Sequence, residues 1–269
     1  MLATTVNSPF LGDDKSNWLL YLLTDSALPT GGFVASSGLE ASYQAGLIPS
    51  ASALPDFTLS AAHSFAFNTV PFVRAGYYTV DSEDPIAALE DADATCDALM
   101  VGNTVARRAS LAQGVAMLTL HIKCFSPDDE VVKQWKKLIR AGKVDGHFAV
   151  CFGLVCRQLS VSIGKAPTTT FLETRLHPVS LTYIIQYHLE NTSHLWLYLF
   201  TRTLYSSAVR MNIIGPYEAQ RMLLKAKEGI EDVVQKTMHL TMDDACQTNP
   251  LLDVCQGMHD RLYTRLFNS

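Results

Sequence analysis

Residues 54–78 read LPDFTLSAAHSFAFNTVPFVRAGYY and decide the fold class. Apolar side chains recur through this stretch at helical spacing with few charges between them, which predicts one long, largely buried helix. Pro71 lies inside the run and predicts a kink, because proline removes a backbone hydrogen bond. Strand patterns are sparse elsewhere and helical spacing recurs, so we expect an all-α protein, a compact bundle of roughly ten helices.

Further helices are predicted on both sides of this stretch from their breaks, caps and apolar spacing, over residues 37–46, 85–100, 101–120, 128–140, 147–161, 171–210, 218–238 and 251–267. Ser37 and Glu40 match a capping box, which would start the first of them. The small side chains on one face of 101–120 would let a neighbouring helix approach closely. We expect a flexible segment over 1–16 and a single helical domain over 17–269, which ends in a docking tail from about residue 250.

Composition excludes several classes of protein. Hydrophobic residues make up 48% of the chain and charged residues 17%, which indicates a large core or apolar surface patches for partners. No stretch approaches the roughly 20 uninterrupted apolar residues of a membrane span, and the N-terminus lacks a secretory pattern, so a cytoplasmic protein is expected. The net charge of -5 argues against nucleic-acid binding. Six cysteines without paired spacing predict a reduced set of buried thiols.

Motifs for catalysis are absent from the sequence. Gly31-Gly32 is followed by no lysine, which argues against a phosphate-binding loop. Neither a GxSxG elbow nor an HExxH pair occurs, so the chain is not expected to be an enzyme.

Two weak metal-site patterns have plainer explanations. Asp91, Asp93 and Asp97 resemble an acidic cluster, but nothing apolar frames them as a pocket, and a solvated helix face is the favoured interpretation. His147 and Cys151 lie one turn apart and supply only two ligands, so packing is favoured over a metal site.

Four segments together resemble the UreF family of urease accessory proteins. The first is DSALPTGGF at 25–33, continued by SSGLE at 36–40. RRAS with QG at 107–114 and GHF with FG at 146–153 resemble two central helices of the family, and NPLLD at 249–253 through RLF at 265–267 resembles its tail. Residues 164–190 look longer than in bacterial members, and 214–220 lacks their Gly-Gln pair. The chain therefore resembles a eukaryotic, fungal-type member.

The resemblance implies an all-helical cytosolic homodimer that hydrolyses nothing itself. It would act as a scaffold that bridges the accessory protein UreD (also called UreH) and the GTPase UreG, so that nickel enters apo-urease. No cofactor would be bound tightly, and whether nickel touches this chain on its way through the complex stays open. An alternative is a GTPase-activating regulator of UreG that inserts an arginine; Arg210 and Arg221 flank the loop at Gly215.

The resemblance also directs attention to particular residues. Candidate partner-interface residues are Glu40, His259, Arg261, Tyr263, Arg265 and Phe267. The alternative is a closing helix that packs on the protein's own body through an apolar stripe at 251, 254, 255, 258, 262 and 266. Structural or tunnel candidates are Arg107, Arg108, Ser110 and His147, with a structural hydrogen bond favoured for the two arginines.

Overall fold

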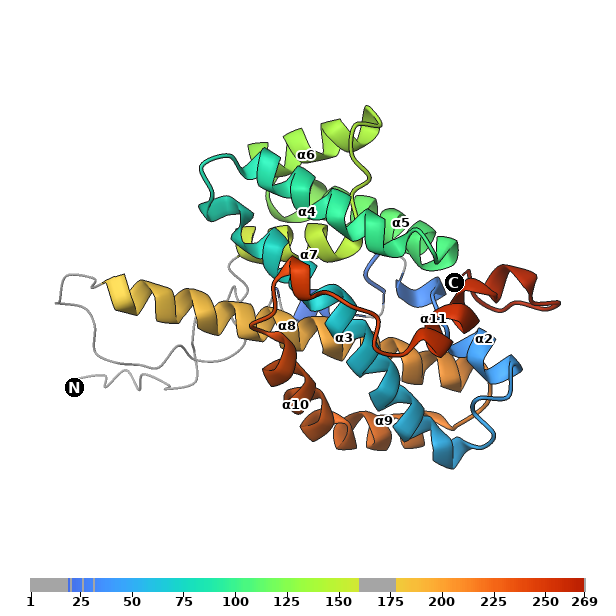
Figure 1. Ribbon diagram of the computed structural model, residues 1–269. Helices are drawn as coiled ribbons and strands as arrows, with labels where there is room; N and C mark the ends of the chain where they lie inside the picture. The colour runs from blue at the N-terminus through green and yellow to red at the C-terminus, as the bar shows by residue number, and fades with distance from the viewer. Residues whose placement is uncertain (1–18, 20, 26, 31, 160–177, 269) are drawn as a thin grey trace, which may run out of the picture.

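The computed structural model describes residue 19 and residues 21–25, 27–30, 32–159 and 178–268, with backbone alone over 178–188. Every regular element in these residues is helical, which confirms the all-α prediction (Figure 1). The α-helices are α2 (Leu39–Gln44), α3 (Leu54–Tyr78), α4 (Pro85–Met100), α5 (Thr104–Leu120), α6 (Glu130–Arg140), α7 (Phe148–Gln158), α8 (Pro178–Arg210), α9 (Pro216–Lys225), α10 (Lys227–Thr237) and α11 (Pro250–Gly257). Short 3-10 or π turns are η1 (Gly32–Val34), η2 (Ala51–Ala53), η3 (Thr79–Asp81), η4 (His121–Phe125), η5 (Met242–Asp244) and η6 (His259–Arg261).

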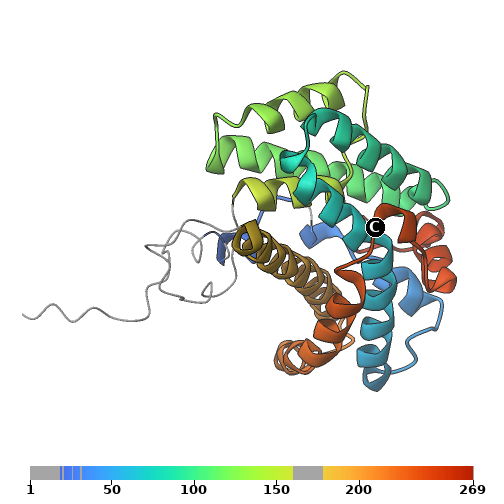
Figure 2. The ribbon, with the colours of Figure 1, turned by 60° about the vertical axis from the view of Figure 1, so that its left-hand side comes forward.

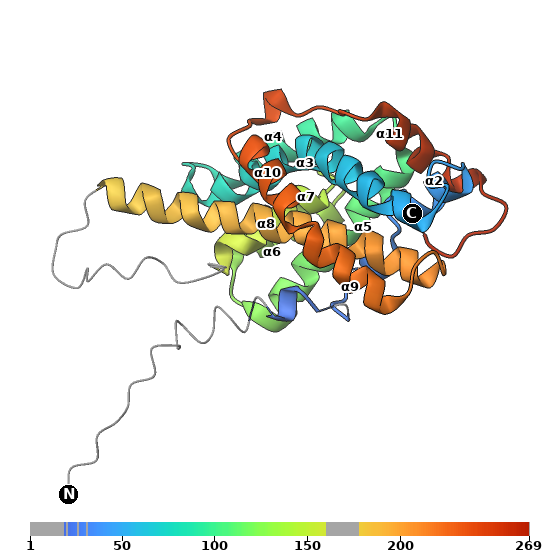
Figure 3. The ribbon, with the colours of Figure 1, turned by 90° about the horizontal axis from the view of Figure 1, so that it is seen from below.

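The helix predicted over 54–78 is the central element of the fold. It is α3, and it contacts α4, α7, α8 and α10. Helices α4, α5 and α6 lie on one side of it and α9 and α10 on the other (Figures 1 and 2). Seen from below, α8 lies alongside α3 and is crossed by α9 and α10 (Figure 3). The core is therefore built around one buried helix, as its apolar sequence predicts.

Glycines let the central helices touch backbone to backbone. A Cβ on Gly76 of α3 would meet the Val150 carbonyl of α7, and one on Gly153 of α7 would meet the Val73 carbonyl of α3. On α5, Gly114 lies against the Gly146 carbonyl in the same way. The small-residue stripe predicted over 101–120 packs only in part: Val105 and Leu120 are buried, whereas Ala112 is exposed and Val101, which precedes α5, is 65% exposed. The close approach depends on the absence of a Cβ.

The predicted capping box is wrong. Helix α2 begins at Leu39 after Gly38, whose φ is 85° and which has no side chain to cap it; the Glu40 amide instead donates to Ser36 Oγ at 3.4 Å. Ser37 also has a positive φ of 52°, so the chain enters the helix through a left-handed turn that glycine favours. The carboxylate of Glu40 is directed to the other end of the chain.

Two helical predictions near the C-terminus also change. The helix expected over 218–238 is divided at Ala226, which ends α9 and begins α10. The helix expected over 251–267 ends at Gly257, and a short turn and an extended segment follow. The expected segment 1–16 and the loop at 164–170 lie outside the described residues.

The thiols are only partly buried. Cys96, Cys151, Cys156 and Cys255 are buried, whereas Cys124 and Cys246 are exposed. Burial raises the pKa of the Cys151 and Cys156 thiols far above the usual range. The expectation that all the thiols are buried is therefore wrong for two of the six cysteines.

None of the described helices combines the length and apolarity needed to cross a membrane.

Candidate partner-docking site

Glu40 of α2 holds the C-terminal segment. Its Oε2 accepts hydrogen bonds from His259 Nε2 at 3.1 Å and from the Phe267 amide at 3.1 Å, and its Oε1 accepts from the Leu266 amide at 2.6 Å. Glu40 is 3% exposed and His259 is fully buried. A buried carboxylate is stable only with such partners, so residues 259–267 are anchored at both of their ends to one side chain.

A second clamp lies beside the first. Both Arg108 Nη atoms donate to the Asp260 carboxylate, at 2.8 and 3.0 Å, in a bidentate pair. Arg265 also donates to Asp260, at 3.1 Å. The hydrogen bond from Arg108, and the charges of both arginines, lower the pKa of Asp260 below its usual value. Arg108 is therefore hydrogen-bonded within the chain, and its partner lies in the tail.

Aromatic stacking closes the end of the chain onto the glycine turn. The Arg210 guanidinium lies 4.3 Å from the centre of the Phe33 ring and 4.4 Å from that of Phe267, and it donates to the Phe33 carbonyl. The Asn268 amide donates to the Val34 carbonyl at 2.8 Å. Cation–π contacts of this kind add to the apolar packing. Arg210, one of the arginines of the GTPase-activating alternative, is thus already engaged within the chain.

Helix α11 is fixed from its other side by Asn103. This residue caps α5 through its Oδ1 and donates from its Nδ2 to the Asp253 carboxylate at 2.8 Å. Sequence reasoning missed Asn103, Asp260 and Arg210 in this site. An Asn before a helix start is a recognisable capping signal, but its long-range partner could not be read from the sequence.

The outward surface of the tail is apolar and aromatic. Tyr263 is fully exposed, and Leu251, Val254, Met258 and Leu266 are 41–60% exposed. The stripe expected to pack on the protein's own body therefore mostly faces outward, while His259 and Phe267, expected to face outward, are buried. For His259 and Phe267 the reason is that α11 ends at Gly257, after which helical spacing no longer predicts which side a residue faces. Arg261 and Arg265 remain exposed beside Tyr263.

A separate buried cluster holds the start of α7. The Asp93 carboxylate accepts from the backbone amides of Asp145, Gly146 and His147 at 2.7–2.9 Å. Asp93 is 2% exposed, so the interpretation of the acidic cluster as a solvated face is wrong for this residue. A carboxylate accepts strong, charge-assisted hydrogen bonds from the backbone amides at the start of a helix.

Asp97 extends this cluster and joins three of the candidate residues. Its Oδ1 lies 3.0 Å from His147 Nε2 and accepts from Arg107, which also donates to Asp145 at 2.8 Å. Ser110 Oγ lies 3.1 Å from His147 Nδ1. The structure therefore brings Arg107, Ser110 and His147 together, and it places Arg108 in the tail site instead.

The order Ser110, His147, Asp97 is that of a catalytic triad, which sequence reasoning did not foresee. The His147 side chain is fully buried, however, and Ser110 Oγ also accepts from the Phe148 amide at 3.0 Å. A nucleophile needs access to substrate and a free path for proton transfer. This arrangement holds α7 in place. Because both ring nitrogens of His147 are engaged in it, His147 and Cys151 do not form a pair of metal ligands.

Ser110 and Gln113 border a cavity of about 210 Å³ between α3, α5, α7, α8 and α11. Its floor is aromatic, formed by Phe65, Phe148 and Trp196, whose Nε1 donates to Thr69 at 2.8 Å. Within the described part of the chain, no three side chains of His, Cys, Asp or Glu gather in a way that would hold a metal ion.

The cluster makes a pH-dependent contribution to stability. Partial burial alone would raise the pKa of Asp97, but hydrogen bonds from Arg107 and His147 outweigh it and lower the pKa below 3.8. A lowered native pKa stabilises the fold above the unfolded-state pKa, and this stabilisation is lost as pH falls through the native value. We expect the Tm of the unaltered chain to fall more steeply than that of Asp97→Asn between about pH 5 and 3. Parallel profiles, as expected for the exposed Asp91→Asn control, would contradict this.

Comparison with known proteins identifies the family. The UreF family model matches residues 48–173 and 177–227. Urease accessory protein F of Oryza sativa subsp. indica is 29% identical over 255 residues, 95% of this chain and 86% of the relative. Urease accessory protein F of Arabidopsis thaliana is 31% identical over 252 residues, 94% and 92% respectively. Urease accessory protein 6 of Cryptococcus neoformans var. grubii is 29% identical over 336 residues, 95% and 98%.

These matches confirm the resemblance and its eukaryotic character. The family model covers the central helices, including Arg107, Ser110 and His147, but neither Glu40 nor the tail. The three relatives extend over almost the whole chain and are plant and fungal proteins. The chain belongs to the UreF family of urease accessory proteins, non-catalytic proteins of urease maturation.

Proposed function

We propose that this chain is a scaffold that bridges UreD (UreH) and the GTPase UreG while nickel is inserted into apo-urease. Family membership supports a role in urease maturation. The observation that carries the finer proposal is the tail: a segment anchored by Glu40 that directs apolar and aromatic side chains outward. Such a surface has no use in a protein that acts alone, and patches of this kind mark interaction sites.

The tail surface has the features of a protein interface. Leu251, Val254 and Met258 share one side of α11 and its continuation, and Tyr263 lies at the tip of the following loop with Arg265 beside it. Tyrosine and arginine are enriched among residues that dominate binding energy. Because Glu40 already orders the segment, a partner would bind without first paying its ordering entropy.

A second apolar surface suits self-association. A groove of about 570 Å³ runs between α8 and the α9–α10 pair, bordered by Tyr198, Leu223, Leu224 and Ile230. Its exposed lining surface is mostly apolar, although Lys227 and Glu231 also border it, and Leu224 is 75% exposed. Permanent homodimer interfaces are more apolar than those with other partners. We therefore assign the groove to the homodimer and the tail, with its arginines, to UreD and UreG.

Co-purification with cognate UreD and UreG, sized by light scattering, tests the scaffold proposal. The unaltered chain should be a dimer that gathers both partners. Tyr263→Ala should weaken capture about tenfold or more, as for an interface hot spot. The matched control is Tyr217→Ala on α9, where an equally large side chain is 85% exposed. A chain that stays alone beside folded partners, or equal effects of the two substitutions, would reject the proposal.

A further inference from the structure

Helix α6 carries a cationic outer face. Lys133, Lys137 and Arg140 recur on it at spacings of three and four residues, and Lys143 follows just beyond its end. Lys136 lies at the margin of this face, half-buried, where its Nζ donates to Thr119 of α5 at 2.6 Å. Residues 131–144 contain five of the 21 Lys and Arg residues of the chain and none of its 26 Asp and Glu. The remainder of the chain is correspondingly acidic.

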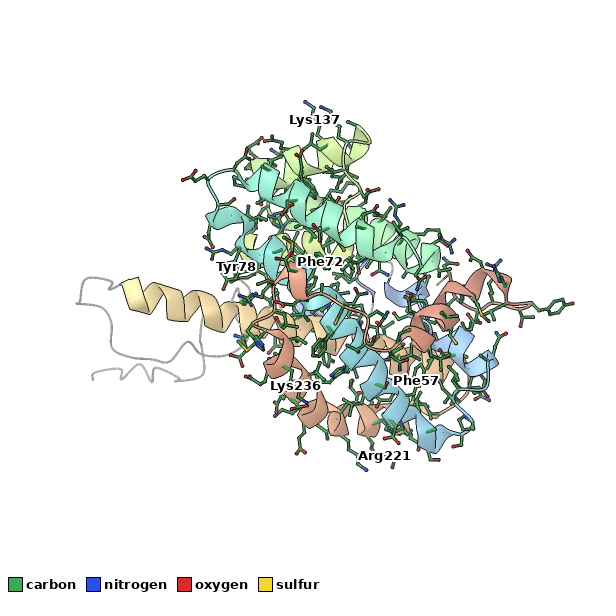
Figure 4. All side chains as sticks on the ribbon, in the orientation of Figure 1. Phe57, Phe72, Tyr78, Lys137, Arg221 and Lys236 are labelled. Carbon is green, nitrogen blue, oxygen red and sulfur yellow. The ribbon has the colours of Figure 1, made fainter. Side chains whose placement is uncertain are left out.

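The position of α6 leaves this face free. Its inner side packs through Val132 and Trp135, both fully buried, against α4 and α5. In Figure 4, Lys137 extends from α6 at the outer edge of the molecule, on the opposite side from Arg221 of α9. The tail site lies on a different edge, beside α2 (Figure 1). The cationic face is therefore separate from the surfaces assigned above.

Elsewhere, about half of the exposed cations among the described residues are matched with carboxylates, whereas Arg221 and Lys225 of α9 stand alone. Lys227 pairs with Glu231, Lys236 with Asp232, and Arg108 with Asp260. On α6, within the described residues, Lys133 alone has such a partner, Glu130 in the first turn.

Unmatched cations repel one another on this face. The pKa of Lys136 is lowered, first by burial and then by the nearby charges of Arg140 and Lys123. The helix dipole favours cations in the last turn, which accounts for Lys137 and Arg140 but not for Lys123 on the neighbouring η4 turn. Bringing carboxylates to this face would relieve the repulsion.

We propose that the outer face of α6 docks an acidic segment of a partner protein, a short run of Asp and Glu residues. From Lys133 to Arg140 the cations occupy about 10 Å of helix, at 1.5 Å per residue, which suits a segment of a few residues. Carboxylates of such a segment would pair with Lys137 and Arg140 and replace the missing intramolecular partners. This contact goes beyond the proposed scaffold function and does not depend on it.

Two observations favour a protein segment over a membrane or a nucleic acid. None of the large apolar side chains of α6 is exposed, whereas surface-bound amphipathic helices insert apolar side chains into the bilayer. An extended polyanion would also encounter the acidic remainder of the chain. Screening over about 8 Å at physiological salt lets a short segment interact with the local face alone.

The test is binding of a fluorescein-labelled deca-glutamate peptide to the full chain, followed by fluorescence anisotropy at low and at physiological salt. The variant is Lys137→Glu/Arg140→Glu, in which both altered residues are exposed. The matched control, Arg221→Glu/Lys225→Glu on α9, changes the net charge equally at exposed positions. Circular dichroism establishes that each variant keeps its helices.

We expect the α6 variant to bind the peptide about tenfold or more weakly than the unaltered chain, since two pairs are lost and replaced by repulsion. The α9 control should bind within about twofold of the unaltered chain. Equal losses in both variants, or no peptide binding at low salt, would overturn the proposal. Tighter binding to phosphatidylserine vesicles or to duplex DNA than to the peptide would also overturn it.

Discussion

Replacing Glu40 by glutamine is expected to release residues 259–268 from the body of the protein. The carboxylate accepts hydrogen bonds from His259, Leu266 and Phe267, and glutamine offers one acceptor oxygen in place of two. Leaving a buried donor unpaired costs about 1–3 kcal/mol, and removing one partner of a buried charged contact costs about 3–5 kcal/mol. A loss of this size exceeds the free energy expected to hold a short terminal segment against the body of the protein.

Hydrogen exchange and limited trypsin digestion measure the release. Amides of residues 259–268 should lose protection, and cleavage after the exposed Arg261 and Arg265 should accelerate at least about tenfold, because cleavage follows the population of the open form. Glu90→Gln, at an exposed position on α4, is the control and should leave both rates unchanged. Unaltered protection in Glu40→Gln would show that the other clamp, Arg108 with Asp260, holds the tail without Glu40.

Replacing Asp93 by asparagine should destabilise the whole fold. Its two oxygens accept the amides of residues 145, 146 and 147, and an asparagine NH2 group would face at least one of these donors. Gly146 has a φ of 83° and lies against Ile139, so the turn cannot shift easily to find other acceptors. We expect a loss of about 3–5 kcal/mol in the free energy of unfolding. For a chain of this size the Tm would fall by about 10 °C.

Urea unfolding followed by circular dichroism is the direct measurement. Asp91→Asn, two residues away on the exposed side of α4, should change the free energy of unfolding by less than about 0.5 kcal/mol. If the two variants unfold at the same urea concentration, the Asp93 carboxylate does not hold the start of α7. A fall for Asp93→Asn alone would establish that the apparent acidic cluster on α4 is divided between an inner and an outer side.

Short-range sequence patterns predicted the bounds of several helices. The bounds of α3 and α4 follow from apolar spacing, from Pro85 in the first turn of α4 and from the glycine and charge breaks between helices. Helix α6 begins after Asp129, whose side chain caps it, as its acidic start indicates. Apolar spacing did not predict the division at Ala226, because the pattern continues across both helices.

The sequence selected some residues of the candidate site but not their arrangement. The resemblance to the UreF family selected Glu40, His259, Arg265, Ser110 and His147 from segments far apart in the chain. It did not indicate that Glu40 and His259 contact each other, because their separation of 219 residues leaves no periodicity to follow. For the same reason, the sequence predicts that Asp93 and Asp97 are solvated, because their hydrogen-bond partners lie on a turn about 50 residues away.

By itself, the sequence determined the helical class, the buried central helix, the missing catalytic motifs and the family, because these depend on residue type and short-range spacing. Tertiary structure alone decided which polar groups are buried and which apolar groups remain outside. A buried carboxylate such as Glu40 or Asp93 requires donors from elsewhere in the chain, and only the folded backbone brings those amides within 3 Å. The exposure of Tyr263, and of Lys137 and Arg140 on α6, follows from the same folding, which directs these side chains toward solvent.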